Sequence, residues 1–100
     1  MIIRGTTPTM TFGLPVDMET LDIGYVIIQQ NGETVIEKKT TECECGNGVV
    51  SAKFTQEETL KLSSEHKAEI NLVLKTLGGD RLESNTIFET VGDTSKEGVI

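Results

Sequence analysis

The stretch IGYVIIQQNGETVIEKKT, residues 23–40, decides the fold class of this chain. Two runs that favour β structure flank the dipeptide Asn31-Gly32. Asn and Gly both tolerate positive φ, which the two central residues of a type I′ hairpin turn require. The sequence therefore predicts an antiparallel hairpin, with the cross-strand neighbours Gln30–Glu33, Ile28–Val35 and Val26–Glu37.

Apolar and polar residues alternate along several other segments, as in strands that have one buried face. Such a strand is expected directly after Pro8, and another over 68–74 with Ala68, Ile70, Leu72 and Leu74 facing inward. A second hairpin is expected over 41–54 around Gly46-Asn47-Gly48, and a last strand over 81–91. The strand over 23–30 is apolar on both faces near Ile27, which favours a central strand covered on both sides.

Helical signals are few. Thr55-Gln56-Glu57-Glu58 has the pattern of a capping box, so a short helical turn is expected near 56–62 with Leu60 as its buried anchor. A briefer turn is expected around 18–21. Six or seven short strands at roughly ten-residue spacing predict an all-β, immunoglobulin-like antiparallel β-sandwich. We expect one domain over 1–92 and a flexible polar tail over 93–100.

Composition agrees with a β fold and excludes some partners. The 100 residues include 14 Thr, 9 Ile and 8 Val but only 2 Ala, and β-branched side chains pack better on strands than on helices. A formal net charge of −7 argues against nucleic acid. No apolar run approaches the roughly 20 residues of a spanning helix, and no secretory leader is recognisable. We therefore expect no membrane partner and a chain made in the cytoplasm.

Few residues suggest catalysis or metal binding. Cys43 and Cys45 are expected on one buried strand face as free thiols, with half of a metal site as the alternative. A dyad of Cys43 with His66, the single histidine, is conceivable, as is a calcium site at Asp17, Glu19 and Asp22. Neither motif is complete, and the glycine pairs are better explained as turns than as phosphate loops. We therefore expect no catalytic residue, cofactor or metal, and no enzyme activity.

Several segments together resemble small proteins encoded in the tail and baseplate gene clusters of phages and prophages of Gram-positive gut bacteria. The likeness lies in Arg4-Gly5-Thr6-Thr7-Pro8-Thr9 before the first strand, Gln30-Asn31-Gly32, the segment 55–60, and the strand 68–74 followed by Gly78-Gly79. The chain is also similar to the N-terminal domain of phage baseplate upper proteins.

The resemblance implies a structural or assembly module that contacts other tail or baseplate proteins, or a second copy of itself. Its expected location is a virion or the bacterial cytoplasm. It implies no active-site residue. We expect the contacts at edge strands, with the strand after Pro8 and the strand ending near Val91 as candidates. A carbohydrate- or host-surface-binding β-sandwich is the alternative, although the chain has no Trp and one Tyr. A small enzyme ranks last.

Overall fold

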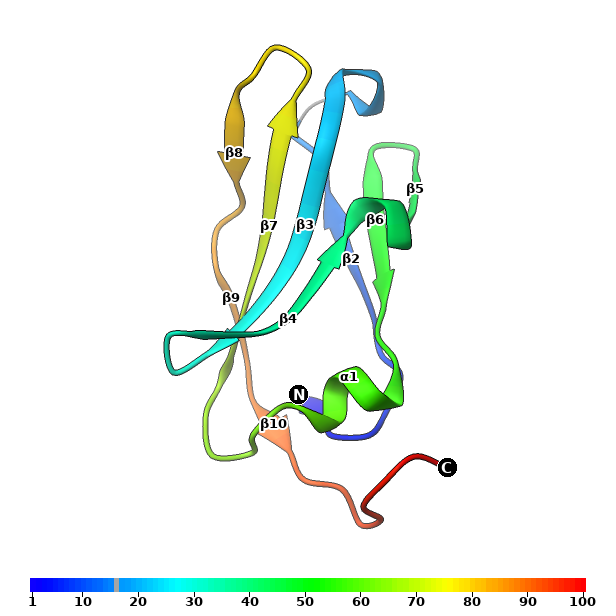
Figure 1. The fold of residues 1–100 in the computed structure, drawn as a ribbon, viewed down its shortest axis with the longest axis vertical. Coiled ribbons are helices and arrows are strands. Elements are labelled where there is room, and N and C mark those ends of the chain that lie inside the picture. Colours follow the sequence, from blue (N-terminus) through cyan, green and yellow to red (C-terminus); the bar gives the residue numbers. More distant parts are fainter. Residues whose placement is uncertain (16) are drawn as a thin grey trace.

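The computed structural model describes residues 1–15 and 17–100, and over these residues the chain is built mainly of strands (Figure 1). The ten strands are β1 (Ile2–Ile3), β2 (Thr9–Gly13), β3 (Leu21–Gln30), β4 (Glu33–Lys39), β5 (Glu44–Gly46), β6 (Val49–Lys53), β7 (Ala68–Thr76), β8 (Arg81–Glu83), β9 (Ile87–Glu89) and β10 (Val91–Gly92). The helical elements are the 3₁₀ turns η1 (Met18–Thr20) and η2 (Thr40–Glu42) and the helix α1 (Gln56–Leu60). None of these described helices is long and apolar enough to cross a membrane.

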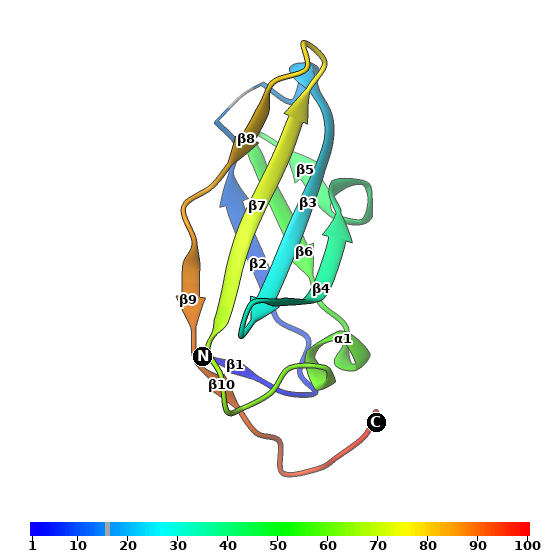
Figure 2. The ribbon, with the colours of Figure 1, turned by 60° about the vertical axis from the view of Figure 1, so that its left-hand side comes forward.

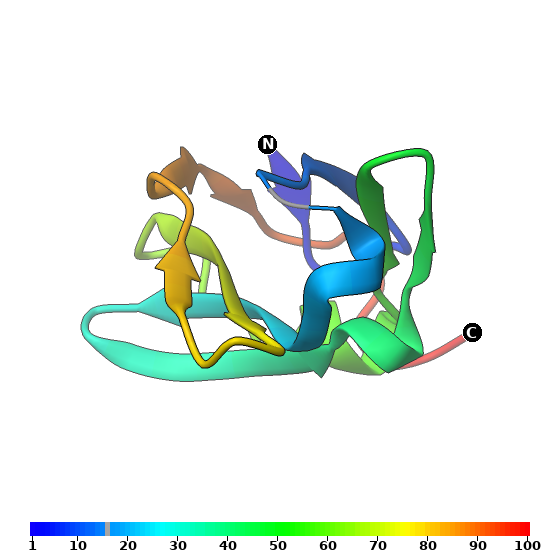
Figure 3. The same ribbon diagram turned by 90° about the horizontal axis from the view of Figure 1, so that it is seen from above.

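The strands form two antiparallel sheets and one small parallel ladder. The larger sheet has the order β4–β3–β7–β8, and β9 also pairs with β7. The smaller sheet has the order β2–β6–β5, whereas β1 and β10 pair in parallel. Figure 2 shows β2 and β6 behind β7 and β3, and Figure 3 looks down the long axis of the two layers. The predicted all-β class is confirmed.

One hydrophobic core joins the two sheets. The larger sheet buries the inward residues of its three long strands, namely Val26, Ile28, Ile36, Ala68, Ile70, Leu72 and Leu74. The smaller sheet buries Phe12, Val50 and Ala52, and Phe54 follows at the end of β6. The predicted inward face of residues 68–74 is confirmed, because the side chains of β7 alternate between buried and half-buried positions.

The hairpin around Asn31-Gly32 is confirmed, but its predicted register is only partly right. Both turn residues have positive φ, and Gln30 lies opposite Glu33. Ile28, however, lies opposite Ile36 and not Val35, and Val26 lies opposite Lys38 and not Glu37. A shift in register next to Ile28 is the cause, since a β-bulge places two residues of one strand against one of the other.

The bulge decides which side chain of β4 enters the core. Without it, period-two alternation would bury Val35 and expose Ile36. With it, Ile36 is buried and Val35 only half-buried. The bulge therefore places the larger aliphatic side chain beside Ile28.

The position of β3 is confirmed as central, but its predicted cover on both faces is wrong. β3 lies between β4 and β7. Its outer face carries Ile23, Tyr25 and Ile27, which are half-buried and line an open groove of about 510 Å³ together with Val73 of β7. No element of the described chain lies over this groove, because the smaller sheet packs on the opposite face.

The strand predicted over 81–91 is divided into β8, β9 and β10. This division is the main reason why the structure has more strands than the six or seven predicted. β8 and β9 pair with β7 in registers that differ by one residue. Ser84 lies at the break, where its hydroxyl accepts a bond from the Leu72 amide at 2.9 Å. The Ser84 hydroxyl thus replaces a backbone carbonyl as the acceptor, and the β7–β8 ladder ends there. β10 then pairs with β1, which alternation had not indicated.

The second hairpin is confirmed, with Asn47 and Gly48 both at positive φ. Its first two predicted strand residues, 41 and 42, instead belong to η2. This turn packs closely on β3 at Gly24, where a Cβ atom would lie 2.7 Å from both Leu74 Cδ2 and Thr40 Cγ2. Glycine is therefore required there by the close approach of neighbouring side chains.

The capping box of α1 is confirmed, but Leu60 is not its anchor. Thr55 Oγ1 accepts from the Glu58 amide at 3.1 Å, and the Glu58 carboxylate accepts from the Thr55 amide at 2.9 Å. Thr59 and Leu62 are 1% and 2% exposed, whereas Leu60 is half-buried. The helix is one turn long, and Leu62, two residues beyond its end, provides the apolar contact with the core.

Glu58 also joins α1 to the larger sheet. Its Oε1 accepts from Lys38 Nζ at 2.9 Å, and Lys38 Nζ lies 5.5 Å from the centre of the Phe54 ring. Burial opposes ionisation of Glu58, but the hydrogen bonds from Lys38 and Thr55 outweigh it, and the net result is a lowered pKa. The pair holds the amino end of the helix against β4.

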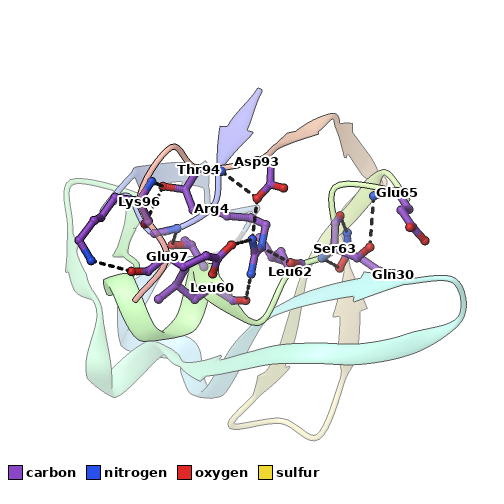
Figure 4. A network of polar contacts seen from close by, with 12 residues as sticks. Arg4, Gln30, Leu60, Leu62, Ser63, Glu65, Asp93, Thr94, Lys96 and Glu97 are labelled. Atoms are coloured by element: carbon purple, nitrogen blue, oxygen red, sulfur yellow. Dashed lines mark hydrogen bonds and ion pairs between the residues drawn. The ribbon is translucent and has the colours of Figure 1, made fainter. Parts of the chain in front are cut away.

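Arg4 connects both ends of the chain to the end of α1 (Figure 4). Its side chain is 18% exposed and donates to the carbonyl oxygens of Leu62 at 2.8 Å and Leu60 at 3.1 Å. It also forms ion pairs with Asp93 at 2.6 Å and Glu97 at 2.8 Å. Residues 93–100 form no helix or strand, and their predicted flexibility stays a prediction.

We predict that Ile70→Asp prevents stable folding. The new carboxylate would be buried in the core without a partner, at a cost of several kcal/mol against a typical domain stability of about 5–15 kcal/mol. The control is the neighbouring Asn71→Thr, which we expect to change the stability little. Asn71 lies on the other, half-buried face of β7, and its Oδ1 has no hydrogen-bond partner to lose within the described residues. The free energy of unfolding of both variants is measured by urea unfolding, monitored by circular dichroism. A similar loss of stability in the two variants would contradict the assignment of Ile70 to the inward face of β7.

A second prediction concerns Glu58→Gln, which we expect to cost about 1–3 kcal/mol near pH 7 because a charge-assisted bond to Lys38 is lost. A lowered folded pKa contributes stability above the unfolded pKa, and this contribution disappears as the pH falls through the folded pKa. The difference in unfolding free energy between the wild type and the variant should therefore shrink between about pH 5 and about pH 2. A difference independent of pH would show that the ion pair contributes nothing.

Candidate functional site

The two candidate edge strands named from the sequence lie along the same open side of the two-layer structure (Figure 2). β2 pairs with β6 alone, and so it forms one edge of the smaller sheet. β8 and β9 pair with β7 alone, and so they form one edge of the larger sheet. β2 is therefore confirmed as an edge within the described chain. Of the predicted last strand, the β8 and β9 parts are confirmed as an edge, whereas β10, which contains Val91, pairs with β1.

An apolar seam runs between these edges. One hollow of about 190 Å³ lies between β2 and β9 and is lined by four apolar residues and two polar ones, namely Met10, Phe12, Ile70, Ile87, Thr11 and Glu89. A second hollow, of about 290 Å³, lies near the other end of β2. Its lining includes Gly13, Pro15, Leu72, Leu74 and Leu82. The core is thus incompletely covered where the two sheets open toward β2.

Within residues 1–15 and 17–100, the backbone of β2 presents unpaired hydrogen-bonding groups along this side. The Phe54 amide donates to the Pro8 carbonyl, and the Leu14 amide donates to the Gly48 carbonyl, at opposite ends of the β2–β6 ladder. Backbone groups of an antiparallel strand point alternately toward and away from the partner strand. Between these two bonds, the amides and carbonyls of Thr9, Thr11 and Gly13 therefore point away from β6.

The edge strand β9 adds exposed apolar side chains to the same side of the molecule. Phe88 is 60% exposed and Ile87 is 45% exposed. Ile87 lies opposite the buried Ile70 and faces the seam, whereas Phe88 lies opposite Glu69 on the outer face of the sheet. Exposed aromatic side chains on a short edge strand are typical of surfaces that bind other proteins.

The edges differ in charge. β4 carries the exposed charges Glu33, Glu37 and Lys39 together with a bulge, and β8 carries Arg81 and Glu83. β5 and β9 are three residues long, and each contains a glutamate. β2 has five residues, none of which is charged. Charges, bulges and shortness are the usual means of blocking edge-to-edge pairing, and β2 has none of these features.

The cysteines do not lie where alternation predicted. Cys45 is exposed and Cys43 only half-buried, both as free thiols, because η2 precedes a β5 too short to form a buried face. Their Sγ atoms lie 3.4 Å from the Lys39 carbonyl and 3.5 Å from the Thr40 carbonyl. Burial, with a smaller effect of Cys45, raises the pKa of Cys43, which favours the protonated thiol over a nucleophilic thiolate.

The other candidate groups are not brought together. His66 is exposed in the loop between α1 and β7, and this loop lies at the end of the molecule opposite to β5 (Figure 1). Asp17, Glu19 and Asp22 are exposed. Over 1–15 and 17–100, no three His, Cys, Asp or Glu side chains are arranged to hold a metal ion.

The outer-face groove and Arg4 were not identified from the sequence as surface features. The alternation of Ile23, Tyr25 and Ile27 was the available signal for the groove, although it indicated cover that the structure does not provide. Arg4 carried no such signal, since its contacts are with residues more than 50 positions away.

Comparisons with protein-family models, curated proteins and solved structures find no match to this chain. The candidate site is an uncharged edge strand beside an apolar seam.

We predict that replacing Cys43 and Cys45 together by serine leaves the domain folded and lowers its free energy of unfolding by less than about 1 kcal/mol. The reason is that a serine hydroxyl can donate to the same carbonyls as the exposed or half-buried thiols. Thermal unfolding and metal analysis of wild type and variant check this. Stoichiometric zinc in the wild type that disappears in the variant would instead support the metal half-site.

Proposed function

We propose that this protein is a non-enzymatic structural or assembly module of a phage or prophage tail or baseplate, and that it acts through contacts with other proteins. The observation that carries the proposal is the uncharged edge strand β2, which lies beside an apolar seam. The sequence resemblance to proteins of tail and baseplate gene clusters supplies the biological setting.

We further propose that the two sheets form an immunoglobulin-like β-sandwich. Two antiparallel sheets around one core, with the non-consecutive neighbours β2–β6 and β3–β7, support this assignment. The hairpin of β3 and β4 stays within one sheet, and the connection from β4 through η2 to β5 crosses to the other. A sandwich of this kind leaves edges open, and open edges are what an assembly module can offer to its neighbours.

Recognition through a sheet edge suits the groups available on this side. Strand addition obtains affinity from backbone hydrogen bonds, and it obtains specificity from pockets for alternate side chains. β2 provides the outward backbone groups of Thr9, Thr11 and Gly13, and the seam provides the pockets. The half-buried and exposed apolar residues Met10 and Ile87 would lose contact with water on assembly.

The test is to locate the protein during phage production. After induction of the prophage that carries the gene, particles and assembly intermediates are separated by density and probed with an antibody. We expect the protein in one of these fractions, together with at least one other tail or baseplate protein. Its absence from both fractions would contradict the proposal, and binding of purified protein to host glycans would instead favour the host-surface-binding alternative.

A further inference from the structure

The edge strand β2 has a pattern that fits a second copy of itself. Its sequence is Thr-Met-Thr-Phe-Gly, and Thr11 is the central residue. Thr9 and Gly13, which lie two positions to either side of Thr11, present their backbone groups outward as Thr11 does. When such a strand is paired antiparallel with its own copy about Thr11, every outward donor meets an outward acceptor.

We propose that β2 pairs with β2 of a second copy, antiparallel and about a two-fold axis at Thr11. This inference rests on the proposed assembly function and names the partner at one edge. Thr11 then lies opposite Thr11 of the second copy, and Thr9 lies opposite Gly13 of the second copy. The smaller sheets of the two copies become one continuous sheet with the order β5–β6–β2–β2–β6–β5.

The side chains agree with this register. On the outer face, the central pair joins two threonines, a favourable cross-strand combination, and each flanking pair joins a threonine to a glycine that has no side chain to obstruct it. On the inner face, Met10 lies opposite Phe12 of the second copy. This pair extends the apolar layer over the seam toward Ile87, which is 45% exposed in a single copy.

Charge favours this edge over the others. Each copy carries a net charge of −7, so two copies repel one another wherever acidic surfaces approach. β2 has no charged residue, and its same-face neighbours on β6 are Val49, Ser51 and Lys53, of which only Lys53, opposite Thr9, is charged. The residual repulsion between whole molecules is screened by salt, so association should strengthen between about 0.05 M and about 0.5 M NaCl.

The experiment uses single cysteines in the full chain with Cys43 and Cys45 replaced by serine. At the two-fold axis, Thr11→Cys places two Cα atoms about 5.5 Å apart, within the range of a disulfide. Ser51→Cys is the matched control on the same face of the sheet. Its two copies would be about 14 Å apart, three strand spacings of about 4.8 Å, which is too far for a disulfide. Under mild oxidation we expect a covalent dimer from Thr11→Cys alone.

A second variant tests the backbone bonds. Thr11→Pro removes an amide that points away from β6, so the β2–β6 ladder is kept, and proline is tolerated at such edge positions. We expect a folded protein by circular dichroism and a dimer dissociation constant raised about tenfold or more, measured by sedimentation at several concentrations. Thr11→Ser, which retains the amide and the hydroxyl, should associate like the wild type.

Three outcomes would overturn the inference: a strict monomer at every concentration and salt level, a dimer that Thr11→Pro does not weaken, or equal cross-linking at positions 11 and 51. Each of these leaves the proposed function standing if the protein is still found in particles or assembly intermediates. Conversely, a β2-linked dimer that is absent from both fractions would support this pairing and contradict the tail-assembly function.

Discussion

The antiparallel pairing of β3 with β7 is the constraint on which the rest of the structure depends. These are the two longest strands, and their inward residues Val26, Ile28, Ile70, Leu72 and Leu74 form the centre of the core. Because β3 and β7 are some 40 residues apart in the chain, closing this loop costs entropy that only the shared apolar face can offset. β4, β8 and β9 are then placed as neighbours of this pair, and the smaller sheet packs on the face that the pair presents.

The end of the molecule that carries α1 and both chain termini is held by polar contacts in addition to apolar packing. α1 is too short to be stable by itself, and the capping box, the Lys38–Glu58 pair and the Arg4 contacts with carbonyls beyond its last turn compensate for its length. A guanidinium suits this position, because its donors reach two carbonyls and two carboxylates at once. The amino-terminal segment, the helix and the segment that follows β10 therefore form one polar cluster around Arg4.

The open side of the molecule follows from the different widths of the two sheets. The smaller sheet has three strands and the larger sheet has more, so part of the inner face of the larger sheet is left with incomplete cover near β9. Of the described edges, β2 alone combines five residues with an absence of charge. The outer groove around Tyr25 is a separate apolar surface on the opposite face of β3. The two surfaces lie on different sheets, which would allow one copy to contact more than one neighbour.

The sequence by itself determined the β class, the turns at Asn31-Gly32 and Asn47-Gly48, the capping box at Thr55, the inward face of β7 and the two edge strands on the open side. These features depend on local backbone preferences and on period-two alternation, both of which can be read within a few residues. Only the tertiary structure decided the bulge that buries Ile36 in place of Val35, the exposure of Cys45, the division of the last strand at Ser84 and the contacts of Arg4. Each of these depends on which distant strand or helix lies alongside, and alternation within one segment carries no information about its neighbours.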